Sequence, residues 1–218
     1  ESYPFELLST ISYFSYKLDP NTGSYTNPKQ MNEWRTTAMI DSAKLKKTKV
    51  LLTVSSHGYT NNNSFLGDQA KWSVLIDSVS KLLLDRDADG VDINFENLPY
   101  LKRGSFNRFI EELRKRLNQK FGIKTRLISL TLLAVDSREI FDIQDLQKFV
   151  DLFVIMGYDY NTGPQLQGAV APLIPFETKN ISLNNTLKYY LEAGIDPSKT
   201  VLALPYYGSM WEGTLGEG

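Results

Sequence analysis

Three polar residues that could carry out chemistry alternate with apolar residues in one short stretch. Asp92, Asn94 and Glu96 alternate with a valine, an isoleucine and a phenylalanine. Alternate side chains of a β-strand share a face, so the three polar groups would lie together and the apolar ones would lie opposite. Burying unpaired carboxylates is costly, and groups held at that cost usually perform a reaction. The stretch 89–96 is therefore the first candidate for a functional site.

The surrounding sequence predicts that this strand belongs to a parallel sheet. Runs rich in β-branched and aromatic residues alternate with segments of helical periodicity, which is typical of an α/β fold with helices covering the sheet. The expected strands are 7–14, 49–56, 89–96, 127–133, 152–159 and 200–204.

Capping residues and apolar spacing place the helices between these strands. Asn27 with Pro28 predicts a helix start, Ser105 and Ser182 predict two more, and helical material after Pro28 is expected to run to about 46. The apolar spacing over 72–83 predicts a helix with Trp72 in the core. A short helix is expected over 146–150, and the three asparagines at 61–63 are expected to form a polar loop.

Composition excludes several functional classes. With 218 residues, 42% of them hydrophobic, the chain can bury a full core. A net charge of -1 gives no basic footprint for nucleic acid. There is no cysteine for a disulfide framework, and no apolar run approaches the length of a membrane span.

The acidic stretch resembles a family signature. Asp89, Asp92 and Glu96 match the pattern DxxDxDxE of glycoside hydrolase family 18, the chitinases and related endo-acetylglucosaminidases, and Asn94 replaces the third aspartate. The resemblance implies a retaining reaction in which the N-acetyl group of the substrate is the nucleophile. By the same resemblance Glu96 is the general acid, and Asp92 and Asp89 support the charge state of the row.

Two further motifs extend the resemblance. Met156, Tyr158 and Asp159 match MxYD, and 205–208 resembles PxYG and contains Tyr207. The resemblance implies that Tyr158 and Asn94 orient the acetamido group and that Asp159 lines the subsite where the sugar is distorted. Met156, Tyr207, Asp89 and Tyr13 are further candidates for substrate contact. No cofactor and no metal are expected.

The fold implied by the resemblance is a TIM-type (β/α)8 barrel, of which about six βα units are evident. The first and eighth strands are not evident, so 1–218 is expected to be the catalytic barrel of a longer chain. The loop 160–178 is long enough to wall a cleft. His57, the single histidine, follows a strand and is more often a structural hydrogen-bonding residue than a catalyst there.

The expected function is hydrolysis of β-1,4-linked N-acetylglucosamine polymers by a secreted or cell-envelope protein. Asn94 leaves two alternatives open. One is a sugar-binding protein that has lost turnover, because an amide cannot offer charge to a developing cation. The other is a structural or adhesion domain without sugar affinity. The retained Glu96 favours the enzyme, but chitin, peptidoglycan and N-glycan cores remain alternative substrates.

Overall fold

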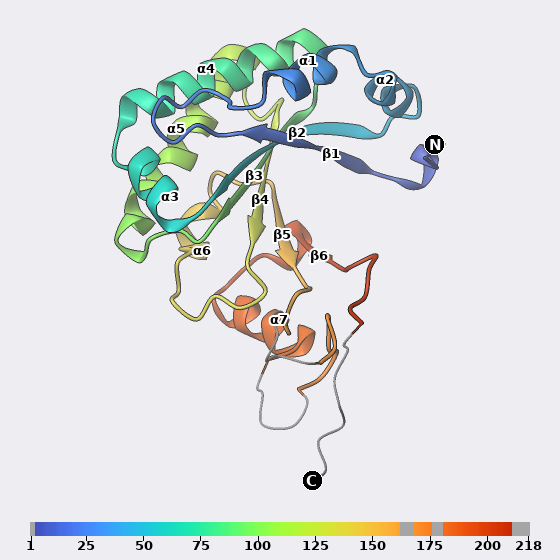
Figure 1. Ribbon diagram of the computed structural model, residues 1–218, viewed down its shortest axis with the longest axis vertical. Coiled ribbons are helices and arrows are strands. Elements are labelled where there is room, and N and C mark those ends of the chain that lie inside the picture. The colour runs from blue at the N-terminus through green and yellow to red at the C-terminus, as the bar shows by residue number, and fades with distance from the viewer. Residues whose placement is uncertain (1–2, 162–167, 176–180, 211–218) are drawn as a thin grey trace.

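A single parallel sheet organises the chain in the computed structural model, which describes residues 3–161, 168–175 and 181–210. Its six strands follow the order of the sequence, and every neighbouring pair is parallel (Figure 1). The strands are β1 (Thr10–Lys17), β2 (Lys49–His57), β3 (Gly90–Glu96), β4 (Leu127–Leu132), β5 (Leu152–Met156) and β6 (Thr200–Ala203). The predicted α/β class is confirmed, and the sheet is open between β1 and β6 in the described residues.

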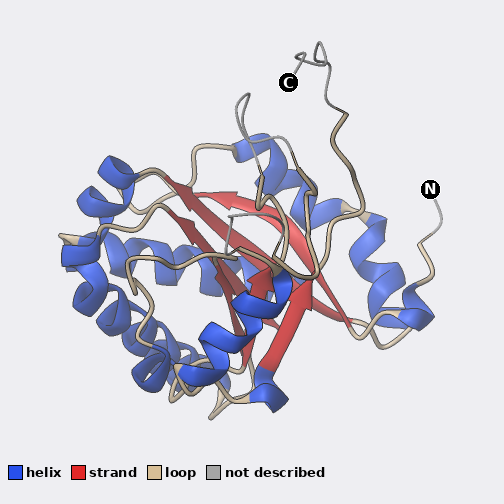
Figure 2. Cartoon of the chain, turned by 90° about the horizontal axis from the view of Figure 1, so that it is seen from below, coloured by secondary structure: helices blue, strands red, loops and turns tan. Residues whose placement is uncertain are grey.

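The helices cover the outer face of the curved sheet, whereas loops gather at the other side (Figure 2). The helices are α1 (Pro28–Thr36), α2 (Ala38–Leu45), α3 (Tyr59–Leu66), α4 (Gln69–Arg86), α5 (Arg103–Phe121), α6 (Ile143–Leu146) and α7 (Leu183–Glu192). Short 3-10 turns occupy Phe5–Leu7, Tyr100–Lys102 and Pro197–Lys199. This layering gives each strand one face against helices and one face toward the interior of the curve.

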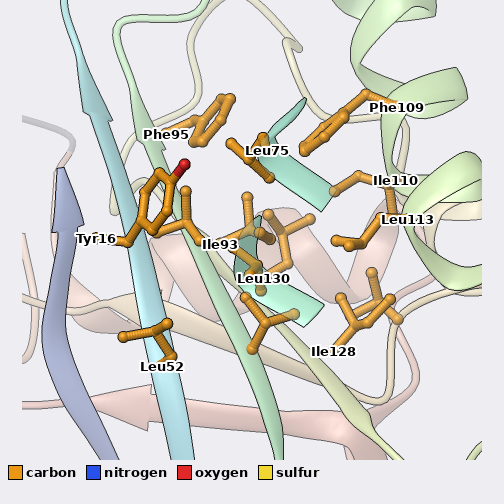
Figure 3. Close-up of a cluster of buried hydrophobic side chains, with 14 of the residues drawn as sticks. Tyr16, Leu52, Leu75, Ile93, Phe95, Phe109, Ile110, Leu113, Ile128 and Leu130 are labelled. Carbon is orange, nitrogen blue, oxygen red and sulfur yellow. The ribbon is translucent and has the colours of Figure 1, made fainter. Parts of the chain in front are cut away.

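The hydrophobic core lies between the sheet and these helices. Ile93 and Phe95 of β3 point into it, beside Leu130 of β4 and the apolar face of α5 (Figure 3). Phe95 stacks on Phe109 with ring centroids 5.8 Å apart, and Trp72 of α4 meets the same ring edge-on. Trp72 is buried, as predicted. The apolar side chains of β3 therefore hold the strand against the helices, and its polar side chains point to the interior of the curve.

Of three local predictions around the first two strands, the helical material expected from Pro28 to about 46 is confirmed apart from one break, and the other two are wrong. The first strand begins at Thr10, because the chain up to Leu7 forms a 3-10 turn. The helical segment after Pro28 is two helices, because Thr37 adopts an extended conformation and accepts a hydrogen bond from the N–H of Met39 as the cap of α2. The asparagines 61–63 lie in α3, whose start follows a sharp turn at Gly58 with φ of 100°.

Two later helices also differ at their starts. Ser105 is inside α5, which begins at Arg103, so it is not a cap. The helix expected over 146–150 instead runs from Ile143 to Leu146 behind the cap Asp142. The predicted cap Ser182 is confirmed, since its hydroxyl accepts from the N–H of Asn185 at 3.2 Å.

Gly90 begins β3 where the neighbouring strand comes very close. A Cβ atom at this position would lie 2.1 Å from the carbonyl oxygen of Leu127, a backbone atom that a rotamer change cannot move. Gly104, near the start of α5, would meet nothing within 4 Å. The β3–β4 pairing therefore needs glycine at 90 but not at 104.

Substituting these two glycines tests the close approach. Gly90→Ala should lower the free energy of unfolding by about 2 kcal/mol or more, because the strands must separate to admit a methyl group. Gly104→Ala, the matched control, should be unchanged or stabilised by up to about 1 kcal/mol, since alanine favours helix. Urea-induced unfolding measures both. An equal effect of the two substitutions would contradict the close packing of β3 on β4.

Candidate active site

The carboxyl ends of β3 and β5 open into one cavity of about 630 Å³. Five of the predicted site residues line it: Asn94, Glu96, Met156, Tyr158 and Asp159. Its remaining lining comes from other strand ends and the loops after them: Phe14, Leu133, Ala134, Val135, Tyr160 and Ile181. Carboxyl ends of barrel strands are where enzymes of this architecture build their sites. The two sequence motifs, about sixty residues apart, thus meet in space.

Asn94 lines this cavity and carries an unused hydrogen-bond acceptor. Its side-chain oxygen Oδ1 is buried and has no partner among the described residues. A buried amide oxygen without a partner is unfavourable, typically by about 1–3 kcal/mol. A ligand that donates an N–H or O–H here would remove that penalty.

Glu96 stands at the end of β3 with its backbone firmly held. Its carbonyl oxygen accepts from the backbone N–H of Gly58 at 3.2 Å and from Nδ2 of Asn62 at 2.6 Å. Its carboxylate Oε1 lies 3.4 Å from Nδ1 of His57, and 30% of the Glu96 side chain is exposed. The carboxyl group is therefore open to a ligand while its main chain is fixed.

Asn62 is a site-positioning residue that the sequence did not indicate. It is fully buried, and its Oδ1 accepts from the hydroxyl of Ser56 at 2.6 Å while its amide donates to Glu96. It thereby ties α3 to the ends of β2 and β3. The only sequence signal was a helical start after Gly58, which three polar residues in a row obscured.

Asp92 lies deeper on the same face of β3. Its two carboxylate oxygens accept from the hydroxyls of Thr53 at 3.1 Å and Thr131 at 3.4 Å, which come from the strands on either side. Burial raises the pKa of Asp92, and hydroxyl donors including that of Ser129 oppose the rise. Asp92 does not line the cavity, so any effect on Glu96 acts through the interior rather than by substrate contact.

The residues after β5 form a linked group. The Tyr207 hydroxyl donates to Oδ1 of Asp159 at 2.7 Å, and the Tyr158 and Tyr207 rings meet edge-on at 6.2 Å. Burial, followed by the negative charges of Glu96, Asp159 and Asp92, raises the pKa of Tyr158. Tyr158 therefore stays a neutral hydrogen-bond donor at the edge of the cavity. Tyr207 reaches the site through Asp159.

Two predicted contact residues are not brought to the cavity. Tyr13 points to the helical side of β1, where its ring packs edge-on against Trp34 at 5.4 Å, and its neighbour Phe14 lines the cavity instead. Asp89 precedes β3 at the opposite end of the strand from Glu96, and its Oδ2 accepts from the N–H of Val50 at 2.8 Å. Alternation along β1 and the length of β3 explain these placements.

The long loop after β5 lies partly outside the described residues, which omit 162–167 and 176–180 of it. At its start, the Tyr160 hydroxyl is 2.6 Å from that of Thr186 in α7. Thr186 in turn donates to the carbonyl of Ala134 at 2.6 Å. This chain of hydrogen bonds joins the loops after β4 and β5 into one wall of the cavity.

The described residues contain no group of three or more histidine, cysteine, aspartate or glutamate side chains arranged to hold a metal ion. In the same residues, no helix is long and apolar enough to cross a bilayer.

The inward row of polar side chains on β3 ends in the accessible carboxyl group of Glu96, at the carboxyl edge of a parallel α/β sheet. The model of the glycosyl hydrolases family 18 matches residues 3–218, and the chain belongs to that family. Drosophila melanogaster "Probable chitinase 2" is 26% identical over 179 residues, which are 78% of this chain and 36% of that protein.

Two solved structures show the fold. The group IV chitinase of Ostrinia furnacalis, solved with allosamidin, has a TM-score of 0.78 at 21% identity, covering 94% of this chain and 59% of that one. The Bacillus cereus spore cortex-lytic enzyme SleL has a TM-score of 0.69 at 20% identity, covering 91% and 43%. The predicted TIM-barrel type is confirmed, and the chain spans less than two thirds of each of these three proteins.

The raised pKa of Asp92 should make the free energy of unfolding depend on pH. Folding raises the pKa of this carboxyl group, so its contribution to the free energy of unfolding is largest below its unfolded pKa of about 3.9. That contribution falls as the pH rises through the pKa of the folded state. The amide of Asp92→Asn does not ionise, so the free energy of unfolding of this variant does not fall for that reason. Urea unfolding from about pH 3 to about pH 7 should show the variant gaining stability relative to the wild type. A constant difference over this range would contradict the buried, raised-pKa carboxyl.

The role of Asn62 can be tested against its exposed neighbour. Asn62→Ala should lower the free energy of unfolding by about 2 kcal/mol, because it leaves the Ser56 hydroxyl and the Glu96 carbonyl with a lost partner. Asn63→Ala, the control on the exposed side of α3, should change it by less than about 0.5 kcal/mol. Chemical denaturation compares them. If both variants matched the wild type, the clamp on the end of β3 would be refuted.

Proposed function

We propose that the protein hydrolyses β-1,4-linked N-acetylglucosamine chains by substrate-assisted, retaining catalysis, with Glu96 as the general acid. The observation that carries this proposal is the unpartnered Oδ1 of Asn94 in the cavity that also holds Glu96 and Tyr158. An acetamido N–H of a bound sugar is a donor of the right kind for that oxygen. The sugar would then lie beside the acid.

In the proposed reaction the substrate supplies the nucleophile, and three side chains of the protein supply the proton transfer and the orientation. Protonated Glu96 gives its proton to the glycosidic oxygen while the acetamido carbonyl oxygen bonds to the anomeric carbon, and the glycosidic bond breaks. Asn94 holds the acetamido N–H, and the neutral Tyr158 hydroxyl donates to the carbonyl side of the same group. Water then opens the oxazolinium ring, and the Glu96 carboxylate takes the proton from that water. The anomeric configuration is retained.

Asn94 also favours a second candidate, a sugar-binding protein with little or no turnover. An amide orients the acetamido group as well as a carboxylate would, but it adds no negative charge to stabilise the oxazolinium cation. Binding would then persist while the rate falls. This candidate makes a distinct prediction, because restoring the carboxylate should restore turnover.

The substrate class is proposed from the chemistry of the site and from the relatives. Proteins named as chitinases and a spore cortex-lytic enzyme share the fold, so chitin and the glycan of peptidoglycan are both candidate substrates. Both contain β-1,4-linked N-acetylglucosamine. Such polymers lie outside the cytoplasm, and we propose secretion or attachment to the cell envelope on that ground alone.

The decisive test uses defined chito-oligosaccharides and mass spectrometry with the full-length protein. Glu96→Gln should reduce turnover about a hundredfold or more while leaving oligosaccharide affinity nearly unchanged, because the amide keeps the shape but has no proton to give. Glu111→Gln, on the exposed surface of α5, is the matched control and should retain wild-type activity.

Asn94→Asp separates the two candidates. Turnover by the wild type that is lost in Glu96→Gln supports a working enzyme. Binding by the wild type without turnover, and turnover in Asn94→Asp, supports the sugar-binding candidate. Equal activity of Glu96→Gln and the wild type would overturn the assignment of the acid.

A further inference from the structure

Another cavity, of about 470 Å³, adjoins the one that contains Glu96, and Arg138 is among the residues that line it. We call it the arginine cavity. The two cavities share Leu133 and Val135, in the segment after β4, so a chain-like ligand bound in one can extend into the other. The volume of the arginine cavity falls within the range of about 300–1,000 Å³ that is usual for small-ligand sites.

Arg138 is the one residue with a positively charged side chain among the described residues that line these two cavities. The residue is exposed, and its guanidinium has no hydrogen bond or ion pair within the described part of the chain. A guanidinium presents five N–H donors in a planar fork, whose shape matches a carboxylate. Arg138 is therefore free to bind an anionic group of a ligand.

The backbone that carries Arg138 is held in a defined turn. Asp136 is nearly buried, and its carboxylate accepts from the N–H of Ile140 at 3.0 Å and from that of Phe141 at 3.2 Å. The side chains of Ile140 and Phe141 are buried in the core, which anchors the far end of the turn. Each oxygen of Asp136 is thus occupied by a backbone donor, while the guanidinium of Arg138 is left for a ligand.

Three neutral polar side chains line the arginine cavity beside Arg138: Tyr59, Asn97 and Ser137. All three residues are exposed, and none of these side chains has a hydrogen-bond partner among the described residues. A hydroxyl or amide can hydrogen-bond to the hydroxyl groups of a sugar. The cavity therefore combines one cation with neutral polar groups, which suits a sugar that carries a single carboxylate.

We propose that Arg138 binds a carboxylate on the sugar next to the one beside Glu96, and that this contact selects the glycan of peptidoglycan over chitin. The inference rests on the proposed function, because it requires an N-acetylated sugar beside Glu96. In peptidoglycan, N-acetylglucosamine alternates with N-acetylmuramic acid, which carries a lactyl carboxyl group. Chitin carries no anionic group, so it gains nothing from Arg138.

The proposal places the protein after another reaction. In intact peptidoglycan the lactyl carboxyl group is joined to a peptide by an amide bond, and it carries no charge. The free carboxylate that Arg138 binds appears when that amide bond is hydrolysed. An amidase reaction therefore has to supply the preferred substrate.

The alternation of the two sugars also fixes the bond that is cleaved. When N-acetylmuramic acid occupies the arginine cavity, its neighbour beside Glu96 is N-acetylglucosamine. The products of cleavage should therefore carry N-acetylglucosamine at their new reducing ends, which mass spectrometry after reduction with borohydride identifies. Products with N-acetylmuramic acid at those ends would overturn the placement of this sugar beside Arg138.

A binding measurement tests Arg138 without turnover. Isothermal titration calorimetry in the Glu96→Gln background of the full-length protein compares a peptide-free tetrasaccharide of the two alternating sugars with chitotetraose. The carboxylated sugar should bind about fivefold or more tightly, because a charged hydrogen bond is added. Adding Arg138→Gln should remove this preference and leave the affinity for chitotetraose unchanged. Arg108→Gln, on the exposed surface of α5, is the matched control and should keep the preference.

The outcomes separate this inference from the proposed function. Equal affinity for the two sugars, or a preference that survives in Arg138→Gln, would overturn the role of Arg138 even if the wild type cleaves chitotetraose. A preference that Arg138→Gln abolishes, in a protein whose wild type cleaves neither sugar, would uphold the contact and reject the proposed reaction. Thermal unfolding checks that the variants are folded.

Discussion

The site depends on the position of β3 between β2 and β4. The apolar side chains of β3 pack against the helices, with Phe95 among aromatic rings of α3 and α5, and this packing turns Asp92, Asn94 and Glu96 inward. The neighbouring strands then supply hydrogen-bond donors to the inward-facing polar side chains. Hydroxyls from β2 and β4 satisfy the buried Asp92, and Gly90 lets β4 come close enough to do so. The unusual polarity of one strand is thus stabilised by the packing on its opposite face.

The three polar positions of β3 differ because their depths differ. Asp92 is enclosed and hydrogen-bonded, Asn94 has a buried oxygen without a partner among the described residues, and Glu96 lines the cavity with a partly exposed side chain. Along this strand the polar groups range from fully hydrogen-bonded to unpartnered. Such an arrangement suits a binding site, because an unpartnered acceptor is unfavourable until a ligand donates a hydrogen bond to it. Asn94 stands where the family motif has an aspartate. The amide removes the negative charge at this position and keeps a hydrogen-bond acceptor.

Periodicity and motif spacing predicted the sheet and the meeting of 89–96 with 152–159 at one cavity. They could not predict which residues at the two ends of a strand would face a ligand. Asp89 matches the motif yet accepts from the N–H of Val50 at the far end, and Asp151 does the same for Ile128 before β5. Tyr13 faces the helices because adjacent side chains of a strand point to opposite faces, and Phe14 takes the side toward the cavity. Asn62 acts through contacts between different elements, which no local pattern encodes.

The most direct test of the site is a crystal structure of the Glu96→Gln variant of the full-length protein with a bound chito-oligosaccharide. The sugar should lie in the cavity between the ends of β3 and β5, with its acetamido N–H donating to Oδ1 of Asn94. The glycosidic oxygen should lie within hydrogen-bonding distance of the side chain at 96. An oligosaccharide bound elsewhere on the surface, with Oδ1 of Asn94 still unpartnered, would contradict the assignment of this cavity as the sugar site.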